Sequence, residues 1–450
     1  MKGHPDDEKL DRYAFHPDAI SDRDAIEEHL RDCRECGEYV AAIRAFAEHI
    51  SHRESWLVDL TFLGKTQSPK QIAKFVEALR IEDEAASVLL DPLIASPAAF
   101  REAAVHDDPR LHTAGAVRYL VGASISARET QPMHAQHLAD SAVVIAEQLS
   151  SASYDRDLIL DLQGNAWCER ANALRYLGEY PAALVAAEHA ARAFKQTRIP
   201  EFDLARVDFI RATIFWKMGR HQEALELVRR SHTVFSRYGD AQREVDCGFL
   251  EGGILFETKQ CDSALTLFLN LRGPVEGLNN PETRARLANN IAAGYQETGW
   301  PSLAAPFFFE ALRLYEDLGL EIERLRTAWS LGLLAMRTLG ATPDVVERLR
   351  QVAAGFTDRG SLSDAALVWL DIAEQQILAE EYDGIVELAR HLIERFTAVG
   401  MLTSAITALQ FLRDAALSRH LTAGDIGHLK SFFLRLGREP ELPFTPPSLA

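Results

Sequence analysis

The amino-acid sequence predicts an all-α protein in which a small helical domain precedes a long array of helical repeats. Two observations lead to this prediction. Helix–turn–helix patterns recur about every 40 residues through most of the chain, and no proline interrupts a long helical pattern near the N-terminus. A recurrence of this length is typical of α-solenoids, in which each repeat packs only against its neighbours.

Composition limits the possible functions. The 450 residues are 47% hydrophobic and 25% charged, with a net charge of −18, which fits a folded soluble protein. Phosphate binding depends on Lys and Arg, so this charge argues against a nucleic-acid partner. The start "MKGHPDDEKL" is acidic where a signal peptide would be apolar, and there is no uncharged apolar run of membrane-spanning length. We expect a cytoplasmic protein with no membrane span.

The first long helix is predicted over residues 22–50, after the capping residue Ser21. It carries His29, Cys33 and Cys36 at positions i, i+4 and i+7. At 100° per residue these side chains fall within about 60° of one another. Three soft ligands therefore share one face. A closed zinc site is tetrahedral, so a fourth ligand must come from elsewhere.

The fourth ligand has two candidates. His4 lies at the start of an earlier predicted helix, "HPDDEKLDRY", whereas His16 follows that helix. We favour His4, which gives the pattern His4-x24-His29-x3-Cys33-x2-Cys36. An alternative is that Cys33 and Cys36 form a redox pair without metal, which leaves the two histidines unexplained. Five cysteines in a chain of this length do not suggest a disulfide framework.

This ligand pattern resembles that of the zinc-binding anti-sigma factor family, in which it reads His-x24/25-His-x3-Cys-x2-Cys. The resemblance covers residues 1–52 and includes the helix–loop–helix layout of "LDRYAFHPDAISDRDAIEEHLRDC". It implies a Zn²⁺ cofactor held by His4, His29, Cys33 and Cys36. It also implies a partner, an extracytoplasmic-function sigma factor whose access to RNA polymerase the domain blocks.

Residues 53–110 are predicted to be a helical connector, with the pattern "SPKQIAKFVEALRIEDEAASVLL". Residues 111–437 are predicted to form the repeats. Their helix–turn–helix corners are spaced by 40 or 41 residues. The turn positions are Gly178, Gly219, Lys259, Gly299, Gly340 and Glu380.

Each predicted corner combines a left-handed turn residue with small residues that allow close helix packing. Ala183, Ala224, Ala264 and Ala304 follow their turns by five residues, and Trp167, Trp329 and Trp369 precede theirs by eleven. We expect these side chains to be core. The pattern resembles the tetratricopeptide repeat family in a longer version. The tail, residues 438–450, is proline-rich and expected to be disordered.

In a solenoid of this kind, the first helices of the repeats are expected to line a concave groove. Polar and aromatic side chains there suit a peptide or small ligand. By register, the groove positions are Asn165, Asn172, Arg206, Trp216, Phe249, Phe256, Asn289 and Gln296.

No catalytic motif is recognised. Gly64-Lys65-Thr66 lacks the upstream glycine of a phosphate-binding loop, since Asp59 stands there. A closed zinc site leaves no position for a substrate water. We therefore expect that the protein is not an enzyme. We expect a cytoplasmic anti-sigma-like regulator whose repeats sense a ligand or protein. The main alternative is an interaction scaffold in which zinc is purely structural; a third is a peptide-sensing regulator controlled through the groove.

Overall fold

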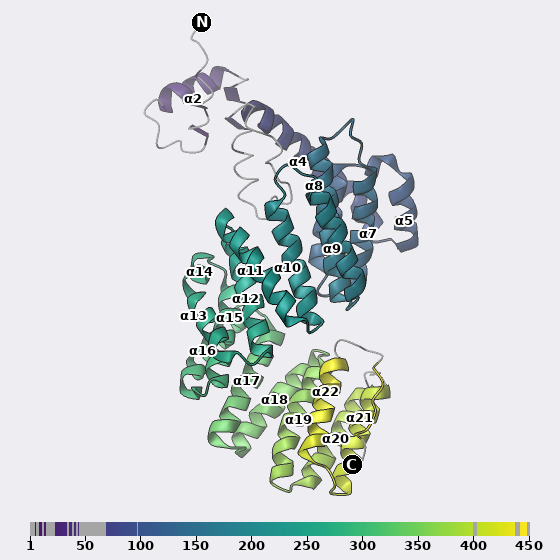
Figure 1. The fold of residues 1–450 in the computed structure, drawn as a ribbon, viewed down its shortest axis with the longest axis vertical. Coiled ribbons are helices and arrows are strands. Elements are labelled where there is room, and N and C mark those ends of the chain that lie inside the picture. Colours follow the sequence, from purple (N-terminus) through teal and green to yellow (C-terminus); the bar gives the residue numbers. More distant parts are fainter. Residues whose placement is uncertain are drawn as a thin grey trace. The chain divides into compact units, whose positions relative to one another are not determined.

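The computed structural model describes Pro5 and residues 9–10, 13–14, 23–33, 36–37, 40–41, 44, 69–96, 98–398, 403–436 and 442–447. Within these ranges, the regular elements are all helices, so the predicted all-α solenoid is confirmed (Figure 1). The chain divides into two compact units: an N-terminal unit up to Gly239 and a C-terminal unit from Asp240. None of the described helices is both long enough and apolar enough to cross a bilayer.

The N-terminal unit stacks antiparallel helical pairs. Helices α4, α6, α8 and α10 pack side by side in chain order, while α7, α9 and α11 each fold back onto the helix that precedes them. The bounds are α2 Arg23–Asp32, α4 Pro69–Ile94, α5 Ala98–Asp107, α6 Ala114–Ala127, α7 Pro132–Gln148, α8 Arg156–Tyr176, α9 Tyr180–Phe194, α10 Glu201–Lys217 and α11 His221–Tyr238.

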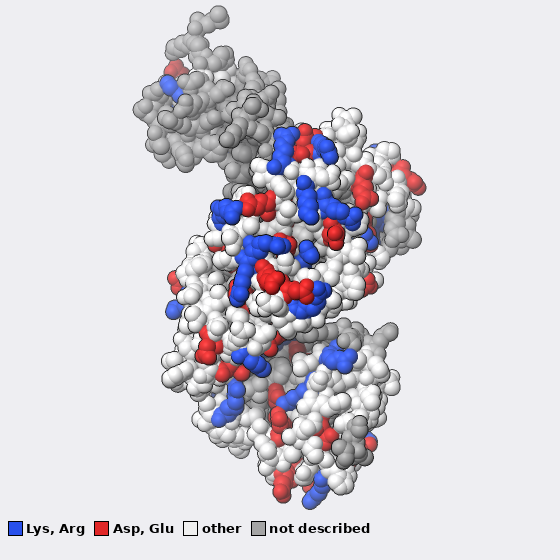
Figure 2. Space-filling model, in the orientation of Figure 1, with Lys and Arg blue, Asp and Glu red and all other residues white. Residues whose placement is uncertain are grey.

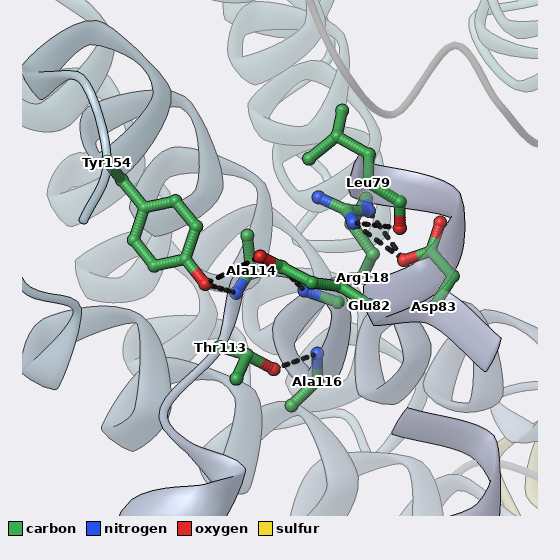
Figure 3. A network of polar contacts seen from close by, with 9 residues as sticks. Leu79, Glu82, Asp83, Thr113, Ala114, Ala116, Arg118 and Tyr154 are labelled. Carbon is green, nitrogen blue, oxygen red and sulfur yellow. Dashed lines mark hydrogen bonds and ion pairs between the residues drawn. The ribbon is translucent and has the colours of Figure 1, made fainter. Parts of the chain in front are cut away.

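Helix α4 lies within the predicted connector, and it is anchored to α6 by a partly buried polar network (Figure 3). Arg118 on α6 donates to the Asp83 carboxylate at 2.9 and 2.6 Å. The Glu82 carboxylate accepts from the Tyr154 hydroxyl at 3.0 Å and from the Gly115 amide at 3.2 Å. A Cβ on Gly115 would lie 2.6 Å from the Glu82 backbone, so only glycine permits this approach.

The same contact continues as an apolar core. Leu79 and Leu90 of α4 are buried in one cluster with Leu120 of α6 and Ile145 of α7. Helix α5 also packs against α7. The helices within residues 53–110 therefore belong to the stack of the N-terminal unit.

The C-terminal unit also contains helical pairs, in which α13 packs on α12, α16 on α15, α18 on α17 and α20 on α19. Its helices are α12 Ala241–Glu257, α13 Cys261–Asn270, α14 Arg272–Gly277, α15 Pro281–Glu297, α16 Pro301–Asp317, α17 Glu321–Leu339, α18 Pro343–Asp358, α19 Leu362–Leu378, α20 Tyr382–Ala398, α21 Thr403–Leu417 and α22 Ala423–Leu436. Helix α21 packs on α20, the second helix of the preceding pair, and α22 packs on α19, the first helix of that pair. The positions of the first and second helices are therefore exchanged in the last pair. Lys430 of α22 bonds Asp371 of α19 at 2.7 Å.

The predicted turn positions are confirmed by backbone conformation. All six have positive φ, between 58° at Glu380 and 84° at Gly299. Ala183, Ala224, Ala264 and Ala304 are fully buried. Trp167, Trp329 and Trp369 pack against the cores of their repeats.

The second helices of these pairs supply large aromatic side chains to the interior. Seven phenylalanines, one from each of seven successive helical pairs, are fully buried: Phe194, Phe235, Phe268, Phe308, Phe356, Phe396 and Phe433. Two of them face glycines of the partner helix. A Cβ on Gly164 would lie 2.4 Å from Phe194, and one on Gly252 would lie 2.3 Å from Phe268.

The C-terminal tail differs from its expectation of disorder over residues 442–447. The Phe444 ring packs at 5.0 Å from Phe432 and 5.9 Å from Phe411, measured between ring centroids. The His428 Nε2 atom lies 2.8 Å from the Thr445 carbonyl oxygen. The prolines do not prevent docking, because an extended segment needs few backbone donors of its own. Packing of the Phe444 ring against α21 and α22 therefore orders this segment despite its proline-rich composition.

Replacing Lys259 by glycine should stabilise the protein. A side chain at its φ of 62° costs about 1–2 kcal/mol, and the greater unfolded-state entropy of glycine returns only part of this. We expect a gain of about 0.5 kcal/mol in the free energy of unfolding, measured by urea titration.

The matched control is Gly219→Ala in the equivalent turn, where φ is 74° and a Cβ would meet no atom within 4 Å. It should cost about 1 kcal/mol. A loss of stability in Lys259→Gly would contradict the account, since it would mean that the lysine side chain itself holds the turn.

Candidate functional site

Helix α2 places His29 through a small core of its own. Ile26 packs with Leu10, Tyr13 and Ala14 from the preceding segment. The Tyr13 hydroxyl donates to Glu27 at 3.3 Å, and the Arg44 guanidinium lies 5.1 Å from the centre of the Tyr13 ring. These contacts fix one side of α2.

His29, Cys33 and Cys36 lie together. Their ligand atoms are all within 4.8 Å of one another, and His29 Nε2 is 3.3 Å from Cys36 Sγ. Cys36 is buried at 5% exposure and also belongs to the small core. The convergence expected from their spacing is therefore present.

The helix that carries them differs from the prediction. A single helix was expected over residues 22–50, whereas α2 ends at Asp32 and Cys33 is not helical. Helical hydrogen bonding nevertheless continues across this point, because the Cys33 amide donates to the His29 carbonyl at 2.8 Å and the Gly37 amide donates to the Cys33 carbonyl at 3.0 Å. The local backbone therefore keeps the helical spacing that places the three ligands on one face.

The three side chains fit a zinc ion. Tetrahedral coordination with ordinary Zn–S and Zn–N bonds places two sulfurs about 3.8 Å apart and a nitrogen about 3.5 Å from a sulfur. The His29–Cys36 distance is close to this value, and the 4.8 Å limit on the set leaves only small rotations to make. The donor set, imidazole and thiol, is the one that structural zinc sites use. His4 and His16, the candidates for the fourth ligand, lie outside the described residues.

Three of the four predicted groove residues of the N-terminal unit belong to a network of buried carboxylates and their partners. Asn165 is 4% exposed and donates to Asp161 at 3.0 Å. Asn172 donates to Glu169 at 3.4 Å. Arg206 of α10 donates to Asp203 at 2.8 Å.

Trp216, the fourth of these residues, is half-buried, and the Lys217 ammonium lies 4.0 Å from the centre of its ring. Asn165, buried against Asp161, does not line an open surface. The other three, Asn172, Arg206 and Trp216, keep part of their surface exposed.

Three buried carboxylates in this network were not singled out from the sequence. Asp161, Glu169 and Asp203 are each 5% exposed or less. Burial raises the pKa of Glu169 to about 7, and the opposing influence of the Arg128 guanidinium at 3.1 Å only partly offsets this. The row Asp161, Asn165, Glu169 at i, i+4, i+8 could have indicated a shared polar face on α8.

The predicted groove residues of the C-terminal unit connect neighbouring helices. The Phe249 ring lies under the Arg286 guanidinium at 3.9 Å, and Arg286 also pairs with Asp246 at 3.2 Å. The Asn289 side-chain oxygen accepts from the Thr327 hydroxyl at 3.1 Å.

The two remaining positions, Phe256 and Gln296, are half-buried. The Phe256 ring packs 5.6 Å from Phe268. Phe249, Phe256 and Asn289 therefore have structural partners, whereas the side-chain oxygen of Gln296 is buried without a hydrogen-bond partner among the described residues. The role of all four in ligand binding stays a prediction.

The surface of the N-terminal unit over α8 to α11 mixes both signs of charge. Figure 2 shows Lys and Arg interspersed with Asp and Glu on the face in view. This face offers no continuous basic area of the kind that binds phosphate backbones.

No protein-family model matches the chain, and neither does any curated protein. Solved structures similar to it include aspartyl phosphate phosphatase F from Bacillus subtilis, at 11% identity over 88% of this chain and 96% of that one, with a TM-score of 0.49. The apo quorum sensor NprR from B. thuringiensis has 12% identity, 81% and 99% coverage and a TM-score of 0.48. A Rap protein complexed with competence and sporulation factor has 14% identity, 80% and 99% coverage and a TM-score of 0.45. Likenesses at this level carry no conclusion about function.

Replacing Glu169 by glutamine should change how stability depends on pH. The folded-state pKa of about 7 exceeds the ordinary value of 4.5, so the folded protein binds the extra proton between these values and wild-type stability falls as pH rises through that window. The shift corresponds to a loss on the order of 3 kcal/mol. The variant, which is neutral throughout, should gain stability relative to wild type between pH 5 and pH 8.

The measurement is urea unfolding of both proteins at pH 5 and at pH 8. A difference between variant and wild type that is the same at both pH values would contradict the buried, protonated state of Glu169. It would mean that Arg128 compensates its charge fully.

Proposed function

We propose that this chain is a zinc-dependent regulator that binds proteins and is not an enzyme. Residues 1–52 hold Zn²⁺ through His4, His29, Cys33 and Cys36 and bind a partner protein, while the repeats within residues 111–437 receive a second protein or peptide. The observation that carries the proposal is the convergence of His29, Cys33 and Cys36 within 4.8 Å. Four protein ligands would close the site, so the ion's contribution is to hold the fold of the domain.

The partner that we propose for residues 1–52 is an extracytoplasmic-function sigma factor, in the cytoplasm. Support comes from the ligand spacing shared with zinc-binding anti-sigma factors. The net charge of −18 suits a partner whose basic surface otherwise contacts nucleic acid. Such a regulator acts by occupying the sigma factor and keeping it from RNA polymerase.

The alternative is a repeat-based interaction scaffold in which zinc only folds the N-terminal domain. It is favoured by the way in which α4 and α5 extend the repeat stack of the N-terminal unit. In this case the domain contributes no partner surface of its own.

The purified protein should contain about one zinc per chain. Cys33→Ser and Cys36→Ser should each remove most of it, because a serine hydroxyl is a poor ligand for zinc. Cys261→Ser, at another half-buried cysteine, is the control and should keep the metal. Elemental analysis of gel-filtered protein gives the ratio. Full zinc in a Cys33/Cys36 double variant would reject the site.

The fourth ligand is decided by the same measurement. His4→Ala should lower the zinc content, whereas His16→Ala should retain it. The opposite result would assign His16.

Removing residues 1–52 should distinguish the proposed sigma-factor regulator from the interaction scaffold. The shortened chain should keep its helical circular dichroism in proportion to its length, because each repeat contacts only its neighbours. Affinity capture from the source bacterium, followed by mass spectrometry, should recover a sigma factor with the full chain. Neither the shortened chain nor Cys36→Ser should capture it. Equal capture of the same partners by the full and shortened chains would favour the scaffold.

A further inference from the structure

The outward side of α4 carries an apolar row that no described residue covers. Ala78, Ile81, Ala85, Val88 and Pro92 are all exposed, and Ile81 and Val88 are 55% and 74% exposed. Their spacing alternates three and four residues, which is the spacing of a coiled-coil seam. A helix with such a row normally packs it against a second helix.

The opposite side of α4 is fixed. Leu79, Ala86, Leu90 and Leu93 are buried against the neighbouring helices, and the Arg118–Asp83 bond ties α4 to α6 (Figure 3). The apolar row is therefore presented on a rigid helix. Rigidity lowers the entropic cost of binding a partner.

One flank of the apolar row is acidic. Glu77, Glu84 and Asp91 recur every seven residues beside it, at positions that face the flanking charges of a partner helix in a coiled coil. Among the side chains that the structure describes on this flank, the one basic residue, Arg80, is already bonded to Glu77 and Glu84. The flank from Glu77 to Asp91 therefore keeps a net negative charge.

These charges select the occupant. In an antiparallel pair of two copies of α4, the acidic flanks would face one another, and like charges at such positions are unfavourable. A helix with Lys or Arg along the matching flank would be attracted. We propose that the exposed face of α4 is a docking surface for an amphipathic helix with a basic flank, supplied by a different protein. The surface contains no proposed metal ligand and is independent of the proposed zinc site.

The test uses the full-length protein and two synthetic helical peptides of four heptads, with leucine at the seam. One peptide carries lysine at the flanking positions and the other carries glutamate. Fluorescence anisotropy should show binding of the lysine peptide about tenfold or more tighter than binding of the glutamate peptide. Equal binding of both, or binding of neither, would overturn the proposal.

Variants locate the binding on α4. Ile81→Ser with Val88→Ser should weaken binding of the lysine peptide at least tenfold. Val185→Ser, at a comparably exposed valine of α9 (58%), is the matched control and should leave binding unchanged. Glu77→Lys with Glu84→Lys should reverse the preference towards the glutamate peptide. All these positions are on the surface, and circular dichroism checks that each variant is folded.

Two further outcomes would assign the face to another occupant and reject the proposal. Concentration-dependent dimerisation in sedimentation, lost in the Ile81/Val88 variant, would identify a second copy. Slow maleimide labelling of a Val88→Cys variant at all protein concentrations, located by peptide mass mapping, would show that the chain covers its own face. Fast labelling at every concentration is expected.

Discussion

A phenylalanine ring buried between the paired helices is the contact on which the stack depends. Each ring is fully excluded from water, which stabilises a pair by about 2–3 kcal/mol per side chain. The facing helix must provide room, as Gly164 does for Phe194 and Gly252 for Phe268. Because a pair is closed by its own ring, and its turn by a residue with positive φ, the same unit can be repeated every 40 residues or so.

Polar bonds between and within the helices limit how readily the inner surfaces can bind a ligand. Neighbouring first helices of the C-terminal unit are joined by polar bonds: Trp329 Nε1 donates to Asp371 at 2.7 Å, and Lys430 of the terminal helix pairs with the same carboxylate. In the N-terminal unit, Asp161, Glu169 and Asp203 are similarly occupied by Asn165, Arg128 and Arg206. Breaking such bonds to bind a ligand carries a desolvation cost. Exposed apolar side chains, such as Ile81 and Val88 on the outward face of α4, do not carry this cost.

The sequence was sufficient for features that depend on local backbone chemistry. The turn positions were predictable even where Lys259 and Glu380 replace glycine, because the period identifies both and Ala264 follows Lys259 at the expected distance. The buried phenylalanines were not, since their spacing varies with where each second helix meets the first. The docking of Phe444 was not predicted either, because it depends on contacts made across the fold rather than along the chain.

The N-terminal domain is stabilised differently from the repeats. Its described core is formed by side chains around Ile26, Tyr13 and Cys36. Cys36 belongs both to that core and to the ligand cluster, so metal binding there would stabilise the packing of the domain directly. The repeats have large cores of their own and no such dependence. If residues 1–52 hold zinc as proposed, loss of the ion would unfold this domain selectively and leave the repeats folded.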